Sequence, residues 1–199
     1  MSFSLDKNII QQLGRVGVLF GGTSAERDVS LKSGAAVCAA LSSVGVNVVA
    51  LDLGHDAVEQ IRAAKIDRAF IALHGVGGED GRMQALLEFL HIPYTGSGVE
   101  ASVIAMDKLR TKQIWRGIGL PTPDFVELHA DCDWQQVLEQ LGGEVMVKPA
   151  HEGSSIGMSR VASATELQRA YNDAARYDSQ VLAERLIVGA EYTVAILDG

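Results

Sequence analysis

Short apolar runs alternate with longer amphipathic stretches through the first hundred residues. In the longer stretches apolar residues recur every three or four positions, which is typical of helices, whereas short apolar runs bounded by turn residues are typical of buried strands. The pattern predicts strands and helices in alternation at residues 15–20, 30–41, 46–53, 57–64, 69–73 and 81–92. Such alternation predicts an α/β fold with a parallel, helix-flanked sheet.

Two of the predicted helices have a clear inward face. For the helix at 30–41 we expect Leu31, Val37, Cys38 and Leu41 to face the sheet. For the helix at 81–92 the inward residues are Met83, Leu86, Leu87 and Leu90, again at three- and four-residue spacing.

From about residue 97 the pattern becomes a mixed α+β one. It predicts a polar helix at 107–117, strands at 123–128, 144–149, 158–161 and 180–187, and helices at 133–141 and 165–177. The final AEYTVAILDG alternates as a strand does and closes on Asp198-Gly199, a hairpin signal with no partner strand after it. We therefore expect the 199 residues to be a truncated piece of a longer protein.

Composition and charge exclude several classes of function. The chain is 47% hydrophobic and 21% charged, which is typical of a globular protein, and its net charge of −8 argues against a nucleic-acid partner. No apolar run approaches the roughly 18 residues of a membrane span, and the first residues lack a signal-peptide pattern. Cys38 and Cys132 match no zinc or redox spacing, as expected of a cytoplasmic protein.

Two glycine-containing loops follow predicted strands. GGTSAERDVS follows the first strand, but Glu26 and Asp28 would repel a phosphate there. ALHGVGGEDG places His74 at the end of the third strand, where it can bind a carboxylate or a phosphate. We expect Asp80 to cap the helix that begins near Gly81, and Glu79 to be structural. Ligands of parallel sheets bind beyond these strand ends.

A third loop, in EVMVKPAHEGSSIG, combines a lysine with small residues. Lys148 ends a strand, and Gly153, Ser154, Ser155 and Gly157 follow. Small residues let backbone N–H groups approach a polyphosphate, and a lysine adds a positive charge. The alternative is a flexible surface loop beside a solvated lysine, and the Walker pattern is absent.

Two further features are open to a functional and a structural interpretation. Lys108 in MDKLRTK lies on a basic helix, where a lysine is usually a solvated surface residue. Glu184 and Glu191 flank the apolar segment 186–188, which either receives an adenine ring and a ribose or is an exposed connection.

Taken in order, six motifs resemble the N-terminal and central segments of bacterial D-alanine–D-alanine ligases of the ATP-grasp superfamily. The motifs are GGTSAERDVS, ALHGVGGEDG, PYTGSG, MDKLRTK, VKPAHEGSSIG and AEYTVAI, and the resemblance extends from about Arg15 to Leu197. It implies a Rossmann-like pre-ATP-grasp domain at 1–97, which binds substrate, and a central α+β ATP-grasp lobe at 98–185. Residues 186–199 would begin a truncated C-terminal ATP-grasp lobe.

The resemblance also implies an activity. In that family ATP phosphorylates the carboxylate of one D-alanine, and the amine of a second attacks the acyl phosphate to give D-alanyl-D-alanine for peptidoglycan. The implied cofactors are ATP with Mg²⁺ or Mn²⁺, and the implied assembly is a homodimer. The metal ligands, an arginine and a tyrosine are expected beyond Gly199, so we expect the 199 residues to be inactive alone.

Site residues carry over from the motifs one by one. The resemblance implies that Glu26 binds the ammonium group of the first D-alanine, that Ser154 is hydrogen-bonded to it, and that these two residues are catalytic. It implies a positioning role for His74 beside the same substrate. For ATP it implies Lys108, Lys148, Gly153, Ser154, Ser155, Glu184, Ile187 and Glu191, with the loop 153–157 as a lid.

The chain departs from the family pattern at two positions, and two rival functions stay open. His151 stands where related sequences often have arginine, and Arg185 where some have lysine. The alternatives are a related D-alanine–D-lactate ligase and a non-catalytic nucleotide-binding module. A dinucleotide oxidoreductase is disfavoured because no G-x-G-x-x-G follows the first strand.

Overall fold

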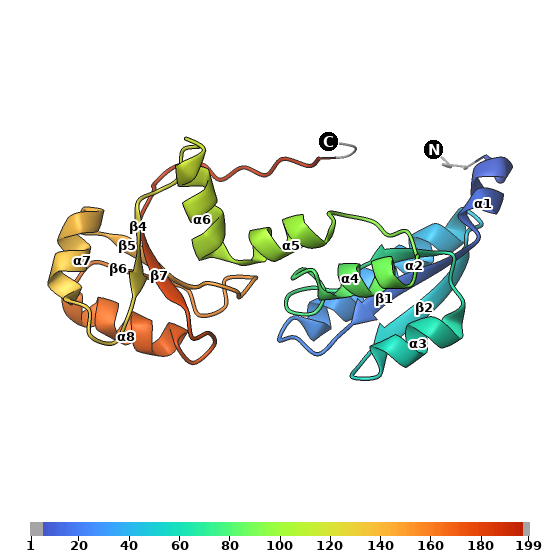
Figure 1. Cartoon of the computed structure of the whole chain (residues 1–199), viewed down its shortest axis with the longest axis horizontal. Coiled ribbons are helices and arrows are strands. Elements are labelled where there is room, and N and C mark those ends of the chain that lie inside the picture. The colour runs from blue at the N-terminus through green and yellow to red at the C-terminus, as the bar shows by residue number, and fades with distance from the viewer. Residues whose placement is uncertain (1–5, 197–199) are drawn as a thin grey trace. The chain divides into compact units, whose positions relative to one another are not determined.

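The computed structural model describes residues 6–196 and divides the chain into two compact units (Figure 1). The first unit comprises the residues up to Gln113 together with His151–Ser154. The second comprises Ile114–Ala150 and the residues from Ser155 onward. These units do not test the predicted domain boundaries at residues 97 and 185, which stay predictions.

The first unit is built on a parallel three-stranded sheet in the order β2-β1-β3. Its strands are β1 (Arg15–Gly21), β2 (Asn47–Leu53) and β3 (Arg68–Ile71). Arg15 lies opposite Asn47 and Val16 opposite Arg68, so the carboxyl ends of all three strands reach the same edge. The predicted α/β sheet is therefore confirmed, with strand ends shifted by a few residues.

The helices of this unit include two that the pattern analysis missed. They are α1 (Lys7–Leu13), α2 (Arg27–Ser43), α3 (Ala57–Ala64), α4 (Arg82–Phe89) and α5 (Val99–Met106); α6 (Lys108–Gly117) contains the boundary at Gln113. Helices α1 and α5 were not predicted. The first buries no side chain and the second buries only Ser102, so neither has an apolar stripe to detect.

Helix α2 packs on the sheet through small residues. The four residues predicted to face inward (Leu31, Val37, Cys38 and Leu41) are only half-buried. The fully buried positions are Ser30 and Gly34 instead. The Ser30 hydroxyl donates to Ala72 O at 2.7 Å and accepts the Gly21 N–H at 2.9 Å, which ties α2 to the sheet. A hydrophobicity pattern does not register contacts of this kind.

The apolar core of the first unit lies between the sheet and its helices. It comprises Leu19, Leu53, Ile61, Ile66, Ala69, Leu73, Met83 and Leu87. Met83 and Leu87 of α4 are buried as predicted, whereas Leu86 and Leu90 are packed against the core with partial exposure. This packing fixes α4 beneath the loop that follows β3.

The second unit has an antiparallel four-stranded sheet in the order β4-β7-β5-β6, as expected of the α+β class (Figure 1). Its elements are β4 (Phe125–Leu128), α7 (Trp134–Leu141), β5 (Val145–Pro149), β6 (Ser159–Val161), α8 (Ala164–Ala174) and β7 (Val181–Arg185). Alternate residues of β5 and β7, including Val147 and Ala183, pack against Leu138 and Leu167 of the two helices. The other face of these strands carries Lys148.

Side chains at the starts of α7 and α8 explain where these helices begin. The Asp133 carboxylate accepts the Gln136 N–H at 3.0 Å. The Ser163 hydroxyl accepts the Glu166 N–H at 3.4 Å, and the Glu166 carboxylate accepts the Ala162 N–H, a reciprocal arrangement like a capping box. The bond from Ala162, followed by that from the Ser163 hydroxyl, lowers the pKa of Glu166.

The strand predicted for the last ten residues is wrong for the part that the structure describes. Residues 190–196 have no regular structure, and Tyr192 and Val194 are 90% and 81% exposed. A strand requires a neighbour to bond its backbone groups, and none of the described strands pairs with this segment. Asp198 and Gly199 lie outside the described residues.

We predict that Gly34→Ala destabilises the first unit. A Cβ atom at Gly34 would lie 2.3 Å from Phe20 Cγ and 2.4 Å from Phe20 Cβ, which is close to the strand backbone and has no easy way to move. Overpacking costs about 1–3 kcal/mol, more than the roughly 1 kcal/mol that alanine gains over glycine in a helix. Urea unfolding followed by circular dichroism should show a net loss of up to about 2 kcal/mol.

The matched control is Gly54→Ala in the same unit. A Cβ there meets only Asp56 Oδ1, at the ordinary contact distance of 3.4 Å. The free energy of unfolding of the Gly54→Ala variant should be unchanged or raised by up to about 1 kcal/mol. Equal effects of the two substitutions would contradict the close packing of α2 on β1.

Candidate functional site

The candidate site lies at the carboxyl edge of the parallel sheet, where the chain turns sharply after β1. Gly21 and Gly22 have φ values of 82° and 79°, which L-residues with side chains rarely adopt. This turn leads to Glu26, which immediately precedes α2 and is only 6% exposed. The Ser24 hydroxyl donates to His74 O at 2.8 Å and accepts the Glu26 N–H at 3.2 Å, so it links the loops after β1 and β3.

Three chain segments meet at the Glu26 carboxylate. The Ser154 hydroxyl donates to Glu26 Oε1. A Cβ atom at Gly75 would lie 2.6 Å from Glu26 Oε2, and one at Gly153 would lie 2.9 Å from it, so any side chain there would displace the carboxylate. Because the group is buried and carries a negative charge, it can hold an ammonium group through a charge-assisted hydrogen bond.

Backbone geometry marks the loop that supplies Ser154. Ser154 and Ser155 have φ values of 47° and 62°, in the left-handed region that residues other than glycine seldom occupy. Such conformations persist where surrounding contacts impose them, and they are concentrated at functional sites. The contact of Ser154 with Glu26 is one such constraint.

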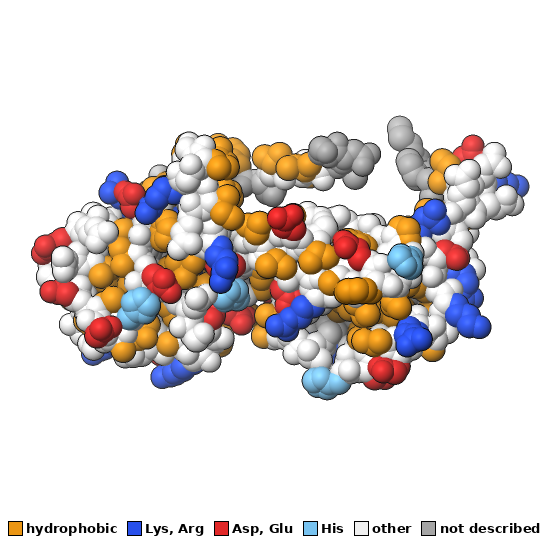
Figure 2. Space-filling view, viewed as in Figure 1, with side chains coloured by type: hydrophobic (Ala, Val, Ile, Leu, Met, Phe, Trp, Pro, Cys, Tyr) orange, Lys and Arg blue, Asp and Glu red, His pale blue; other side chains and the backbone are white. Residues whose placement is uncertain are grey.

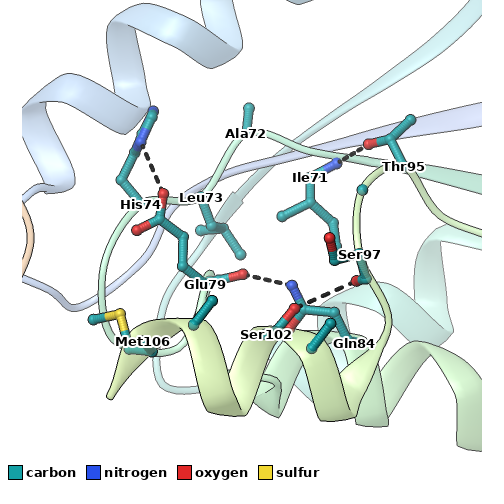
Figure 3. A pocket seen from close by; sticks show the side chains of 14 residues that line it. Ile71, Ala72, Leu73, His74, Glu79, Gln84, Thr95, Ser97, Ser102 and Met106 are labelled. Atoms are coloured by element: carbon teal, nitrogen blue, oxygen red, sulfur yellow. Dashed lines mark hydrogen bonds and ion pairs between the residues drawn. The ribbon is translucent and has the colours of Figure 1, made fainter. Parts of the chain in front are cut away.

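The imidazole of His74 contacts α2 and its own loop. Its Nε2 lies 3.1 Å from Ser33 Oγ, and its Nδ1 lies 3.7 Å from Glu79 Oε1 (Figure 3). Glu79 Oε2 accepts the Gly75 N–H at 2.9 Å, a structural contact as expected. His74 therefore belongs to the wall of the site through its loop, and its predicted role in positioning substrate stays a prediction.

Asp80 takes the predicted capping position at α4. Its Oδ1 accepts the Arg82 N–H at 3.3 Å, from one residue before the N-cap Gly81. The start of α4, and with it the end of the His74 loop, is therefore set by a local contact.

The segment that carries Gly153 is held by residues around the start of α6. Lys108 Nζ donates to Glu152 O, and His151 Nε2 lies 3.4 Å from Asp107 Oδ2. Arg110 Nε lies 2.7 Å from the same carboxylate oxygen. Pattern analysis did not identify Asp107, although an acidic residue directly before a basic helix is a recognisable capping signal.

An arginine that the sequence analysis did not single out supports the β1 turn. Arg27 Nη1 donates to Gly22 O at 3.0 Å and lies 2.8 Å from Asp52 Oδ1. The hydrogen bond with Asp52 raises the pKa of Arg27. The turn is thus held by the residue that follows Glu26.

In the second unit, Lys148 and Glu184 form an ion pair on adjacent strands. Met146 lies opposite Glu184 and Lys148 opposite Leu182, so the two charged residues are diagonal neighbours on one sheet face. Lys148 Nζ donates to Glu184 Oε1. An ammonium group has three donors, so it can keep this bond and still bind a phosphate oxygen.

The remaining predicted ATP-binding residues lie outside the helices and strands. Ser155 lies in a turn, and its carbonyl oxygen accepts the Met158 N–H at 3.3 Å. Ile187 is 64% exposed, and Glu191 lies on the exposed segment that follows β7. The structure thus brings together Glu26, Gly153 and Ser154 in the first unit and Lys148 with Glu184 in the second.

Other kinds of site have little support in the part of the chain that the structure describes. Residues 6–196 contain no group of three or more His, Cys, Asp or Glu side chains arranged to hold a metal ion. No helix within that range has the length and apolar character needed to cross a bilayer. On each unit, the face visible in Figure 2 intersperses basic with acidic side chains.

Comparison with known proteins identifies the family. A family model described as D-ala D-ala ligase N-terminus matches residues 54–97, and one described as D-ala D-ala ligase C-terminus matches residues 114–199. The chain is 60% identical over 190 residues to D-alanine–D-alanine ligase B of Pseudomonas putida strain KT2440, covering 96% of this chain and 60% of that protein. It is 61% identical over 187 residues to the Saccharophagus degradans D-alanine–D-alanine ligase, covering 94% and 60%.

Solved structures agree in fold. The D-alanine–D-alanine ligase of Bacillus anthracis superposes with a TM-score of 0.80 at 40% identity, over 88% of this chain and 58% of that one. A structure of a ligase from the same organism complexed with ATP gives a TM-score of 0.76 at 37% identity, over 88% and 60%. The chain therefore spans about 60% of the length of the relatives that it matches. With both family models matched in chain order, the chain belongs to the D-alanine–D-alanine ligase family.

Proposed function

We propose that this chain carries the first-substrate site and part of the ATP site of an ATP-dependent D-alanine–D-alanine ligase. The observation that carries the proposal is the buried Glu26 carboxylate, which Ser154 contacts and which Gly75 and Gly153 closely enclose. Similarity to named ligases supports the same reaction.

The carboxylate suits one end of an amino acid. The ammonium group of D-alanine binds Glu26 by a charge-assisted hydrogen bond, while the Ser154 hydroxyl keeps the carboxylate oriented. The substrate carboxylate then points away from Glu26, since like charges repel, and is free to accept a phosphoryl group. The close contacts of Gly75 and Gly153 exclude water from the amine-binding side, which strengthens the electrostatic attraction.

ATP is the proposed phosphoryl donor, as the ATP complex of the Bacillus anthracis ligase supports. Lys148 and Lys108 bind phosphate oxygens and Glu184 contacts the adenine side, while Lys108 also holds the glycine-rich loop through its bond to Glu152 O. Phosphoryl transfer is chiefly a matter of alignment and charge neutralisation, which lysines on a rigid strand and helix supply.

The implied Mg²⁺ stays a proposal, with its ligands expected beyond Gly199. Mg²⁺ needs several oxygen ligands in near-octahedral geometry, and residues 6–196 offer no such acidic group. We therefore assign this chain no metal-dependent step. A homodimer and a cytoplasmic location also stay proposals, which the family resemblance supports.

We predict that Glu26→Gln weakens D-alanine binding about ten- to hundred-fold. The amide keeps the shape of the side chain but loses one charge-assisted contact, which is worth roughly 1.5–3 kcal/mol. Isothermal titration of the chain with D-alanine measures the loss, and affinity for a non-hydrolysable ATP analogue should not change. Asp28→Asn, an exposed carboxylate in the first turn of the same helix, is the control and should bind normally.

We predict that Lys148→Ala weakens binding of the ATP analogue by a similar factor, about ten- to hundred-fold, and spares D-alanine. Arg160→Ala removes another ion-paired cation of the same sheet, bound to Glu144 at 2.7 Å, and should leave both affinities unchanged. Thermal unfolding of both variants checks that the unit stays folded. Equal weakening by the two substitutions would argue for general electrostatics instead of a phosphate contact.

We predict that the 199 residues alone release no phosphate from ATP in response to D-alanine, because they cover only about 60% of the ligases that they match. Joining them to the remaining C-terminal portion of the Saccharophagus degradans relative should restore dipeptide formation. D-lactate in place of the second D-alanine tests the rival ligase. Phosphate release by the 199 residues alone, dependent on D-alanine, would contradict the prediction.

A further inference from the structure

A pocket of about 460 Å³ lies beside the loop that follows β3 (Figure 3). Its wall includes the end of β3, the His74–Glu79 loop, α4, residues 95–97 and α5. On this side Gly78 and Glu79 line the pocket, and Gln84 lines it from α4. The position of the loop therefore depends in part on its contacts with neighbouring elements.

Gln84 of α4 makes one of these contacts. The residue is only 6% exposed and lines the pocket, and its Nε2 donates to Gly78 O at 2.8 Å (Figure 3). Its Oε1 is buried and has no hydrogen-bond partner among the described residues. Burying a side-chain amide whose oxygen makes no hydrogen bond lowers the stability of the fold. This cost indicates that the bond from Gln84 to the loop serves a purpose other than stability.

The loop between Gly75 and Glu79 is closed by three internal hydrogen bonds. The Glu79 N–H donates to Gly75 O at 2.9 Å, the Gly78 N–H donates to the same oxygen at 3.1 Å, and the Gly75 N–H returns to Glu79 Oε2 at 2.9 Å. A displacement of Gly78 therefore displaces Gly75, the residue that closes over Glu26 Oε2.

Gly78 also fits tightly against the segment that follows β3. A Cβ atom there would lie 2.4 Å from Leu73 Cβ and 2.9 Å from the Leu73 carbonyl carbon. Gly78 is thus packed against Leu73, just after β3, and is hydrogen-bonded to Gln84 of α4.

We propose that Gln84 is a positioning residue, whose bond to Gly78 holds Gly75 against the Glu26 carboxylate and so sets the affinity for the first amino acid. The inference rests on the proposed function, because it assumes that Glu26 binds the ammonium group of that amino acid. Gln84 acts through the loop and touches no substrate.

The first test is Gln84→Leu in the 199-residue chain. Leucine removes the bond to Gly78 and also the unpaired Oε1, and because the Gly78 carbonyl then loses this donor, thermal unfolding of the variant is measured beside the binding. D-alanine affinity should fall about five-fold, the usual effect of one neutral hydrogen bond, and affinity for the ATP analogue should stay constant. Hydrogen exchange of the Gly75 and Glu79 amides, followed by NMR, should accelerate by a similar factor.

The matched control is Gln60→Leu on α3. Its Nε2 donates to Asp56 Oδ1 at 2.8 Å, so the substitution removes a side-chain amide bond of the same length, here an exposed one, from another helix of the same unit. D-alanine affinity and the exchange of the loop amides should both stay unchanged.

Gln84→Glu gives a pH-dependent readout that a purely structural role would not produce. As a carboxylate, the new side chain cannot donate to Gly78 O, whereas the protonated acid can. Burial raises the pKa of such a carboxyl, so the donor returns as the pH falls through that raised value. The measured quantity is the D-alanine affinity of Gln84→Glu divided by that of the unsubstituted chain at the same pH. This ratio should rise as the pH is lowered.

Unchanged D-alanine affinity and unchanged loop exchange in Gln84→Leu would overturn the proposal. A loss of affinity for D-alanine and the ATP analogue together would also overturn it, since that result indicates general destabilisation. If the unsubstituted chain fails to bind D-alanine, the proposed function is wrong. The exchange rates of Gly75 and Glu79 then still decide whether Gln84 anchors the loop.

Discussion

The buried carboxylate of Glu26 is the group around which the first unit is arranged. A carboxylate inside a protein must be hydrogen-bonded or paired, because removing it from water costs several kcal/mol. Ser154 supplies one hydrogen bond, and the loop after β3 and the Gly153 segment close around the remaining surface. In the proposed function, the ammonium group of the substrate binds this same carboxylate through a charge-assisted hydrogen bond.

This arrangement depends on residues that lack bulk. Gly75 and Gly153 touch the carboxylate through their backbones, Gly78 lies against the segment that follows β3, and Gly34 lets α2 approach Phe20. A methyl group at any of these positions would meet an atom within 3 Å. At this edge of the sheet, close contacts of the backbone therefore take the place of side-chain packing. Hydrogen bonds such as that from Gln84 to Gly78 O hold the loops in position.

Much of the fold could be predicted because burial leaves a periodic signal. Strands β1, β2 and β5 read as apolar runs, and α4, α7 and α8 have apolar stripes, so each was found to within a few residues. Helix α1 and helix α5 carry no such stripe and were missed. The segment at 190–196 alternates like a strand but lacks a paired neighbour among the described elements, and backbone pairing, not alternation, makes a strand.

The sequence by itself determined the residue types of the site and the order of its motifs: a carboxylate after a glycine turn, a lysine at a strand end, and serines in a small-residue loop. Only the tertiary structure decided which of them meet, because Glu26 and Ser154 are 128 positions apart and their contact depends on loop conformation. It also decided that the imidazole of His74 turns toward Ser33 and that Asp107 and Gln84 support the site. Such contacts leave no periodic trace, since single hydrogen bonds between distant segments depend on geometry that local preferences do not encode.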